Sequence, residues 1–427
     1  MRPPEPSSAA PPSRILLRGN LLWLSVVSLL NDAASEMIYP LLPLFLAMVL
    51  GAGPAFLGVI EGVAEASSSL LKLAGGVVAD RSGRRKALVA WGYGIAAVGR
   101  PLIAVAASAW QVLGIRFADR VGKGLRTAPR DALLAESVPP EVRGAAFGIH
   151  RAADHAGAVI GPLLASGLLL LLPHLFPPGS APHSALFGDL GTPQGQLRLV
   201  FAFALVPGLL TFLVVMGKVR EPPRVVAAAP ASAGRGLLPP LRELGPVLPR
   251  YLGVLALFAL GNSSDAFLLL RARDLGVAAA LIPLLWAALH VSKMVWNVIG
   301  GRMSDRTGPR AAIVGGWFVY AAVYVGFAFA GAQWQAWALF VVYGLFFGLT
   351  EAPEKALVAA LAPAAVRGSA FGWFHAVAGV AALLASLLFG LLWDAFGPHA
   401  AFLTGAALAL AAALLLPLAV PRRVVAV

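Results

Sequence analysis

Cysteine is absent from all 427 residues of this sequence. Without a thiol, the chain holds no disulfide framework, no thiolate nucleophile and no cysteine-ligated metal ion. The HExxH pattern, the Walker A phosphate loop and a GxSxG turn in a suitable context are missing too. We therefore predict no catalytic residue, no metal site and no cofactor, and a membrane-embedded enzyme is a less favoured class.

Charged residues are also scarce, at 12% of the chain against about 25% in a typical soluble domain. Hydrophobic residues make up 59%, and the mean hydropathy is +0.80. The apolar runs extend over roughly 20 residues, as membrane-crossing helices do, rather than alternating over about 10, as barrel strands do. The sequence therefore predicts an all-α membrane protein.

Twelve apolar runs are long enough to cross a membrane, which predicts two six-helix bundles. A tail (1–19) precedes the first bundle (20–217), a linker rich in Pro, Ala and Gly (218–249) leads to the second (250–420), and a short tail (421–427) follows. The predicted spans are approximately 20–50, 54–79, 87–107, 109–135, 144–172, 197–217, 250–271, 275–300, 310–331, 333–361, 368–392 and 396–420.

The lysines and arginines predict the orientation, because cytoplasmic loops of membrane proteins are enriched in both. With both termini in the cytoplasm, only Arg198, Arg271 and Arg273 fall in outer segments. The net charge of +13 then reflects the basic cytoplasmic segments of a multi-pass inner (plasma) membrane protein. We therefore expect no nucleic-acid partner.

Three motifs of the first half recur in the second at nearly one offset. "GVVADRSGRRKAL" at 76–88 matches "GRMSDRTGPRAAI" at 301–313. "RGAAFG" at 143–148 matches "RGSAFG" at 367–372, and "APRDAL" at 128–133 matches "APEKAL" at 352–357. Such a repeat predicts two similar bundles with a binding site between them near the middle of the membrane.

These motifs resemble those of the major facilitator superfamily. The loop from Gly76 to Arg85 resembles its signature loop, and "RVGKG" at 120–124 resembles its fourth-span motif. Gly148, Gly157, Gly161 and Pro162 resemble the fifth-span motif of its drug/proton antiporter branch, with Ala165 and Ser166 in place of the usual glycine pair. These glycines predict close packing of the fifth span against another helix, and the Gly-Pro step predicts a kink. The resemblance implies a twelve-helix secondary transporter that works by alternating access.

The resemblance also implies a cytoplasmic gate. Asp80 would dock beside Arg367 at the start of the eleventh span, and Asp305 would face Arg143, so Asp80→Asn is expected to weaken closure. The residues expected to form this gate are Gly76, Asp80, Arg81, Gly83, Arg84, Arg85, Arg143, Gly301, Asp305, Arg306, Gly308, Arg310 and Arg367.

The fourth span is unusually charged. At 100° per residue its charges lie within an arc of about 140°, and each base facing lipid would cost about 2.5–3.5 kcal/mol. They must therefore line a wet cavity or pair with acids, or else only fasten the bundle as structural ion pairs. The candidates are Arg116, Asp119, Arg120, Lys123 and Arg126, opposite Asp32, Glu36 and Tyr39 of the first span and Glu61 and Glu65 of the second.

The second half has fewer polar residues within its spans. These are Asn262 and Asp265 on the seventh span, Trp286, His290, Lys293 and Asn297 on the eighth, and His375 on the eleventh. Histidine titrates near neutral pH, and a carboxyl removed from water ionises less readily. Glu65 and Asp32 are therefore the leading candidates to carry a proton, followed by Glu36, Glu61, Asp265 and His290, although each histidine also fits a hydrogen-bonded core position.

The sequence thus predicts a proton-coupled transporter of a small organic molecule, with export by antiport as the favoured mode. We expect a monomer whose partners are substrate, protons and the lipid bilayer, with the proton gradient as its energy source. Proton symport, or export of an anionic metabolite or metal chelate, is the alternative, favoured by the bases of the fourth span. A non-transporting sensor would usually need a soluble signalling domain.

Overall fold

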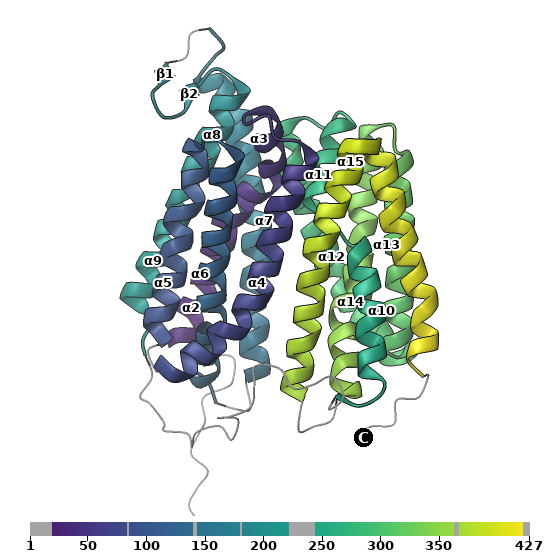
Figure 1. The fold of residues 1–427 in the computed structure, drawn as a ribbon. Helices are drawn as coiled ribbons and strands as arrows, with labels where there is room; N and C mark the ends of the chain where they lie inside the picture. Colours follow the sequence, from purple (N-terminus) through teal and green to yellow (C-terminus); the bar gives the residue numbers. More distant parts are fainter. Residues whose placement is uncertain are drawn as a thin grey trace, which may run out of the picture.

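The computed structural model describes residues 19–82, 85–139, 143–179, 182–221, 244–362 and 367–421. Helices make up almost all of this part of the chain (Figure 1). The exception is an antiparallel pair of two-residue strands, β1 (His183–Ser184) and β2 (Gly188–Asp189), in the loop above α8. The predicted all-α fold is confirmed, apart from this short pair.

The first half is built from spans whose ends follow local sequence signals. Pro40 and Pro43 interrupt the first span, because proline removes a backbone donor inside a helix. Ser108 caps the fourth span by accepting from the backbone N–H of Gln111. The elements are α2 (Gly19–Ile38), η1 (Tyr39–Leu41), α3 (Leu42–Met48), α4 (Pro54–Ser82), α5 (Arg85–Gly99), η2 (Arg100–Val105), α6 (Ala109–Glu136), α7 (Arg143–Leu175), α8 (Pro193–Phe203) and α9 (Leu205–Lys218).

The second half opens with a broken span. Helix α10 (Leu248–Gly261) ends at Asn262, and α11 (Ala266–Asp274) resumes after Asp265, so polar residues occupy the break. The remaining elements are η5 (Ala279–Leu281), α12 (Ile282–Thr307), α13 (Pro309–Phe329), α14 (Gln333–Leu361) and α15 (Arg367–Ala419).

The spans agree in number with the prediction. Among the described residues, nine helical segments are long and apolar enough to cross a membrane. One of them, 370–419, holds two spans, because Gly397 with φ 81° interrupts its helical backbone. Helices α4 and α6, which carry several charges, complete the twelve.

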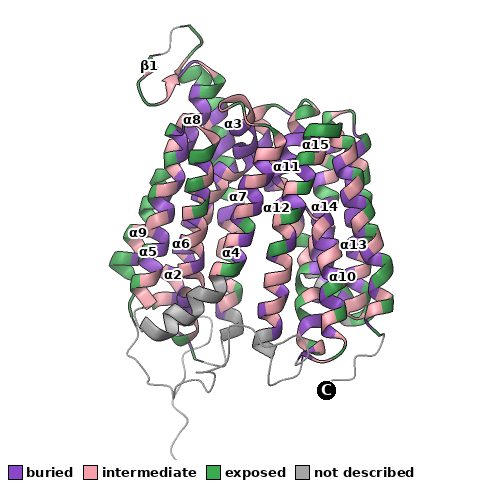
Figure 2. Cartoon of the chain, in the orientation of Figure 1, coloured by how far each residue is buried: buried purple, intermediate pink, exposed green. Residues whose placement is uncertain are grey.

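The two halves stand side by side, with the first half on the left of Figure 1 and the second on the right. Large apolar side chains lie exposed on the outer faces, for example Trp91 at 70% and Leu418 at 81% exposure (Figure 2). Such a surface suits the hydrocarbon of a bilayer. The bundle boundaries at residues 217 and 250 remain a prediction.

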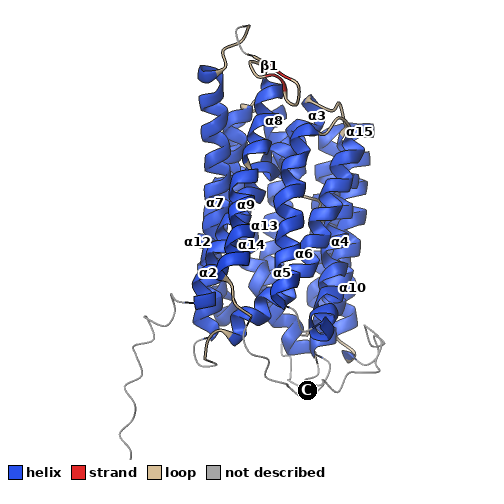
Figure 3. Cartoon of the chain, turned by 90° about the vertical axis from the view of Figure 1, so that its left-hand side faces the viewer, coloured by secondary structure: helices blue, strands red, loops and turns tan. Residues whose placement is uncertain are grey.

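Glycines bring helices together both within the first half and between the halves. A Cβ on Gly157 would meet the backbone of Leu29 and the side chain of Asp32, and one on Gly161 would meet the backbone of Ala33. Helices α2 and α7 therefore pack closely, as the fifth-span motif predicted, and the two lie together in the view of Figure 3. Gly58 packs similarly against Ser386, which joins α4 to α15.

Gly148 does not take part in this packing, although the motif predicted it. A Cβ at Gly148 would have nothing within 4 Å. The position lies in an earlier turn of α7, on an exposed face. Pro162 is buried in α7 next to Gly161.

Candidate functional site

A cavity of about 560 Å³ lies between the two halves. Its wall is formed by α2, η1, α4, η2 and α6 on one side, and by α10, the break before α11, α12, α14 and α15 on the other. The cavity follows α6 as far as Arg126 and α14 as far as Glu354. Beyond its other end the halves contact each other, where the backbone N–H of Ala55 donates to Asp394 at 2.9 Å and the Ser166 hydroxyl donates to the carbonyl of Ala280.

Most of the predicted cavity residues line this wall. They are Asp32, Glu36, Tyr39, Glu61, Glu65, Arg120, Lys123, Arg126, Asn262, Asp265, Trp286 and Lys293. The structure therefore brings acids of the first two spans, bases of the fourth and polar residues of the second half around one space. The part each residue plays in transport stays a prediction.

Two predicted residues of the fourth span are buried in ion pairs instead of lining the cavity. The Arg116 guanidinium donates to Glu61 at 2.7 Å, and Asp119 accepts from the Arg100 Nε at 2.9 Å. Arg116 and Asp119 are 7% and 2% exposed. A charge buried this deeply needs a partner, so for these two residues the alternative of structural pairing holds.

Three predicted residues of the second half also lie outside the cavity wall. The ring of His290 meets Trp286 edge-on at 5.1 Å, and no hydrogen-bond partner of its nitrogens is found among the described residues. Asn297 donates to Glu351 at 3.3 Å, and the ring of His375 lies 5.2 Å from that of Phe374. These three side chains therefore contact residues of the cavity wall without lining the cavity themselves.

Arg100 links the first, third and fourth spans and was not among the predicted site residues. It lines the cavity, pairs with Asp119, and donates to both the carbonyl and the side chain of Asn31 at 3.0 Å. Asn31 in turn donates to Asp32 at 2.8 Å. An arginine within an otherwise apolar span was the signal that could have identified it.

Five side chains connect the halves at the inner end of the cavity, next to the closed side. The Trp286 Nε1 donates to Glu36 at 2.7 Å, and the Tyr39 and Trp286 rings lie 5.1 Å apart. The Ser264 hydroxyl donates to Glu61 at 3.2 Å and lies 3.3 Å from the Tyr39 hydroxyl. The carboxylates of the cavity therefore also hold the two halves together.

The second half contributes one ion pair to the wall. Lys293 Nζ lies 3.8 Å from Asp265, which also accepts from the Tyr343 hydroxyl at 2.8 Å. The same ammonium lies 3.4 Å from the centre of the Phe347 ring, a cation–π contact. Lys293 is thus held against its own half.

The cavity wall of the second half also includes residues that the prediction missed. Glu351 and Glu354 lie on α14, and Glu354 accepts from the Trp317 Nε1 at 3.3 Å. The aromatic side chains that line the wall are Phe258, Tyr343, Phe346, Phe347 and Phe374. The acids within span 333–361 were visible in the sequence, whereas phenylalanines in an apolar span do not reveal which way they face.

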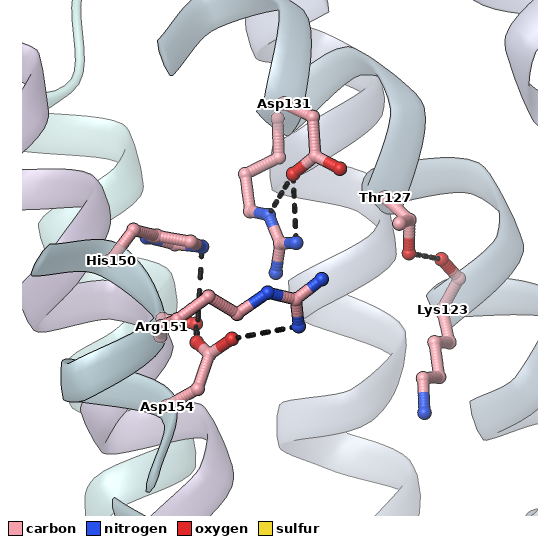
Figure 4. Close-up of polar contacts among 8 residues, drawn as sticks. Lys123, Thr127, Asp131, His150, Arg151 and Asp154 are labelled. Atoms are coloured by element: carbon pink, nitrogen blue, oxygen red, sulfur yellow. Dashed lines mark hydrogen bonds and ion pairs between the residues drawn. The ribbon is translucent and has the colours of Figure 1, made fainter. Parts of the chain in front are cut away.

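A second polar cluster lies behind the cavity wall, among α2, α6 and α7 (Figure 4). Its centre is Asp154 of α7, which accepts from the hydroxyl of Ser28. Arg151 lies 3.4 Å from Asp154, and His150 lies 3.8 Å from it. None of these residues was singled out in the sequence.

The predicted gate falls mainly outside what the structure describes. Gly83 and Arg84 lie outside the described residues, as do the side-chain surroundings of Gly76, Asp80, Arg81, Arg143, Gly301, Asp305 and Arg367. Among the described gate residues, Arg85 pairs with Glu136, Gly308 adopts φ 83° where α12 meets α13, Arg306 is exposed and Arg310 is partly buried. Docking across the halves remains a prediction.

Comparison with known proteins agrees with this architecture. The model of the Major Facilitator Superfamily matches residues 24–353 and also residues 251–426. An uncharacterized MFS-type transporter of Methanocaldococcus jannaschii is 32% identical over 406 residues, which cover 94% of each chain. The multidrug resistance protein MdtH of Salmonella newport is 32% identical over 132 residues, or 31% of this chain and 33% of MdtH.

A solved structure shows the same fold. It is the inward-facing, unoccupied structure of a bacterial homolog of the human lysosomal transporter Spinster, with a TM-score of 0.69, 19% identity and 96% coverage of both chains. The family model and the archaeal relative each span most of the sequence. The chain therefore belongs to the Major Facilitator Superfamily and is a multi-pass membrane transporter rather than an enzyme.

Proposed function

We propose that this protein exports a small organic molecule across the inner (plasma) membrane in exchange for protons. The observation that carries the proposal is the group of acids in the cavity wall, Asp32, Glu36, Glu61 and Glu65. Two of these carboxylates, on Glu36 and Glu61, also accept hydrogen bonds from the opposite half. A proton bound there would remove the charge that makes these bonds strong.

Proton and substrate movement are coupled because these carboxylates both bind protons and connect the two halves. When a carboxylate is ionised, its charge-assisted hydrogen bonds favour the arrangement in which the halves touch beyond the cavity. When the carboxylate is protonated, this arrangement loses stability relative to the one in which the halves separate at that end. Proton binding and substrate binding then bias the same two-state equilibrium, so each changes the affinity for the other.

The alternative substrate, an anionic metabolite or metal chelate, has support from Arg120, Lys123 and Arg126 in the wall. The same wall carries seven carboxylates against five bases in total. This balance favours a substrate without net negative charge, and proton symport remains the second mode. We further propose that both termini face the cytoplasm and that the transporter acts as a monomer.

Proteoliposomes with an internal pH-sensitive dye test the proposal. Compounds representing organic cations, anions and neutral molecules are added one at a time, with and without an imposed pH gradient. We expect at least one compound to move protons only when the protein is present, in the direction opposite to its own movement. If an imposed pH gradient never drove substrate movement, the proposed proton coupling would be refuted. If protons and substrate moved in the same direction, the protein would be a symporter.

A further inference from the structure

Asp154 is a partly buried carboxylate outside the wall of the substrate cavity. Its side chain is 13% exposed, and the hydroxyl of Ser28 on α2 donates to it. The groups that interact with it come from each packed helix: Ser28 and Asp32 from α2, Arg130 from α6, and His150 and Arg151 from α7. Figure 4 shows His150 and Arg151 directed toward Asp154.

Asp154 and Asp32 are neighbours across the α2–α7 contact. Ser28 and Asp32 are one turn apart on α2, and Asp154 and Gly157 are almost one turn apart on α7. Ser28 bonds to Asp154, while the side chain of Asp32 packs where a Cβ of Gly157 would be. The glycine thus lets α7 approach α2 closely enough for the two carboxylates to interact electrostatically.

The two carboxylates face different spaces. Asp32 lines the substrate cavity, whereas Asp154 is not among the residues that form its wall in the described structure. The cluster around Asp154 leads outward instead, to Arg151, whose side chain is 67% exposed. On α6, Arg130 contacts Asp131, whose side chain is 38% exposed. Arg151 and Asp131 therefore connect the cluster to the protein surface outside the cavity wall.

We propose that Asp154 is a proton-carrying residue that shares the transported proton with Asp32, through a route separate from the substrate cavity. This rests on the proposed function. A proton from the outward-open cavity binds the ionised Asp32 carboxylate and passes, by way of the Ser28 hydroxyl, to the carboxylate of Asp154. Asp32 is then ionised again, and Asp154 releases the proton to the cytoplasm.

The absence of native cysteine allows a direct test by spin labelling. Cysteines replace the exposed residues Ala87 and Ala360 in one protein, and Ala107 and Gln333 in another. Inter-label distances in purified protein are measured by electron paramagnetic resonance between pH 5 and 9, with protons as the only ligand. Infrared difference spectra over the same range report which carboxyls titrate.

In the otherwise unchanged protein we expect a pH-dependent shift between two distance populations and at least two titrating carboxyl bands. Asp154→Asn should remove one band and move the midpoint of the shift by about one pH unit or more, a tenfold change in proton affinity. Asp154→Glu should restore a titrating carboxyl. Asp189→Asn, which changes a carboxylate in the loop that carries β1 and β2, outside the cavity wall, should leave both readouts unchanged.

A solely structural Asp154 gives a different result. The infrared spectrum of Asp154→Asn would then keep every titrating band, and the midpoint would stay within the error of the unchanged protein, which would overturn the inference. If Asp32→Asn changed the pH dependence while Asp154→Asn left both the midpoint and the titrating bands unchanged, this inference would fail while proton coupling stood. If compound-driven proton movement were also absent, the proposed function would fail as well.

Discussion

The two walls of the cavity differ in chemistry although they come from repeated halves. The first half contributes eight charged residues and one aromatic ring, Tyr39, whereas the second contributes four charged residues and six aromatic rings. The charges of the first half continue behind the wall into the Arg100–Asp119 pair and the Asp154 cluster. The rings of the second half continue into a core of stacked aromatics, such as Phe258 on Trp317 at 4.5 Å.

This difference indicates a division of labour, in which the two halves have different functions in transport. Buried charges have to be paired, and they respond to protonation, so the first half is suited to carry the proton. Aromatic faces bind apolar and cationic groups without needing exact hydrogen-bond geometry, so the second half is suited to hold the body of an organic substrate.

The largest effect is expected from breaking the buried ion pair of the first half. Asp119→Ala leaves the Arg100 guanidinium buried without its carboxylate, which should reduce the free energy of unfolding by about 3–5 kcal/mol. Thermal unfolding in detergent measures the loss. Glu136→Ala is the control, because it breaks a more exposed pair with Arg85 and should cost about 1 kcal/mol or less. Equal losses would contradict the importance of the buried network.

A smaller effect is expected where the two walls meet. Trp286→Phe keeps an aromatic ring beside Tyr39 but removes the donor to Glu36, a bond to a charged group worth about 1.5–3 kcal/mol. The Ala107–Gln333 label pair should then show more molecules with the closed end open. Trp317→Phe removes a similar bond to Glu354 within one half and should leave that distance unchanged. The same change in both variants would refute a bridging role for Trp286.

The smallest effect concerns the close approach of α2 and α7. Gly157→Ala should lower the free energy of unfolding by about 1–3 kcal/mol, because the added Cβ overlaps the backbone of Leu29. Gly148→Ala meets open space and should be neutral or gain up to about 1 kcal/mol of helix propensity. A lower free energy of unfolding for Gly157→Ala, with an unchanged or higher one for Gly148→Ala, would support the close packing of α2 and α7. A destabilised Gly148→Ala would contradict it.

Much of the fold and part of the site were predictable from the sequence. Helical periodicity placed Arg120 and Lys123 on the face that lines the cavity, and Asp32 and Glu36 on a shared face of α2. Both predictions depend only on the angular positions of residues around a single helix axis, which their spacing in the sequence determines. The glycine spacing of α7 similarly identified two of the close contacts with α2.

Relations between helices were harder to predict. Whether Arg116 faces the cavity or pairs with Glu61 depends on the depth and rotation of α4 relative to α6, which no single span determines. Arg100 was not predicted because it stands almost alone among the polar residues of its span, so no periodic face marked it. Asp154 was not predicted either, because its contact with Ser28 lies between two helices. The phenylalanines of the wall resemble lipid-facing ones until the bundle is assembled.

The division of labour between the halves is tested most directly by comparing two kinds of flux in the same proteoliposomes. The transported compound is followed once under an imposed pH gradient and once as exchange without a gradient, in Asp32→Asn, Glu65→Gln and Phe347→Ala proteins. We predict that the two first-half variants lose gradient-driven flux and keep exchange, whereas Phe347→Ala lowers both to the same extent. Gradient-driven flux unchanged in both Asp32→Asn and Glu65→Gln would contradict the assignment of proton coupling to these residues.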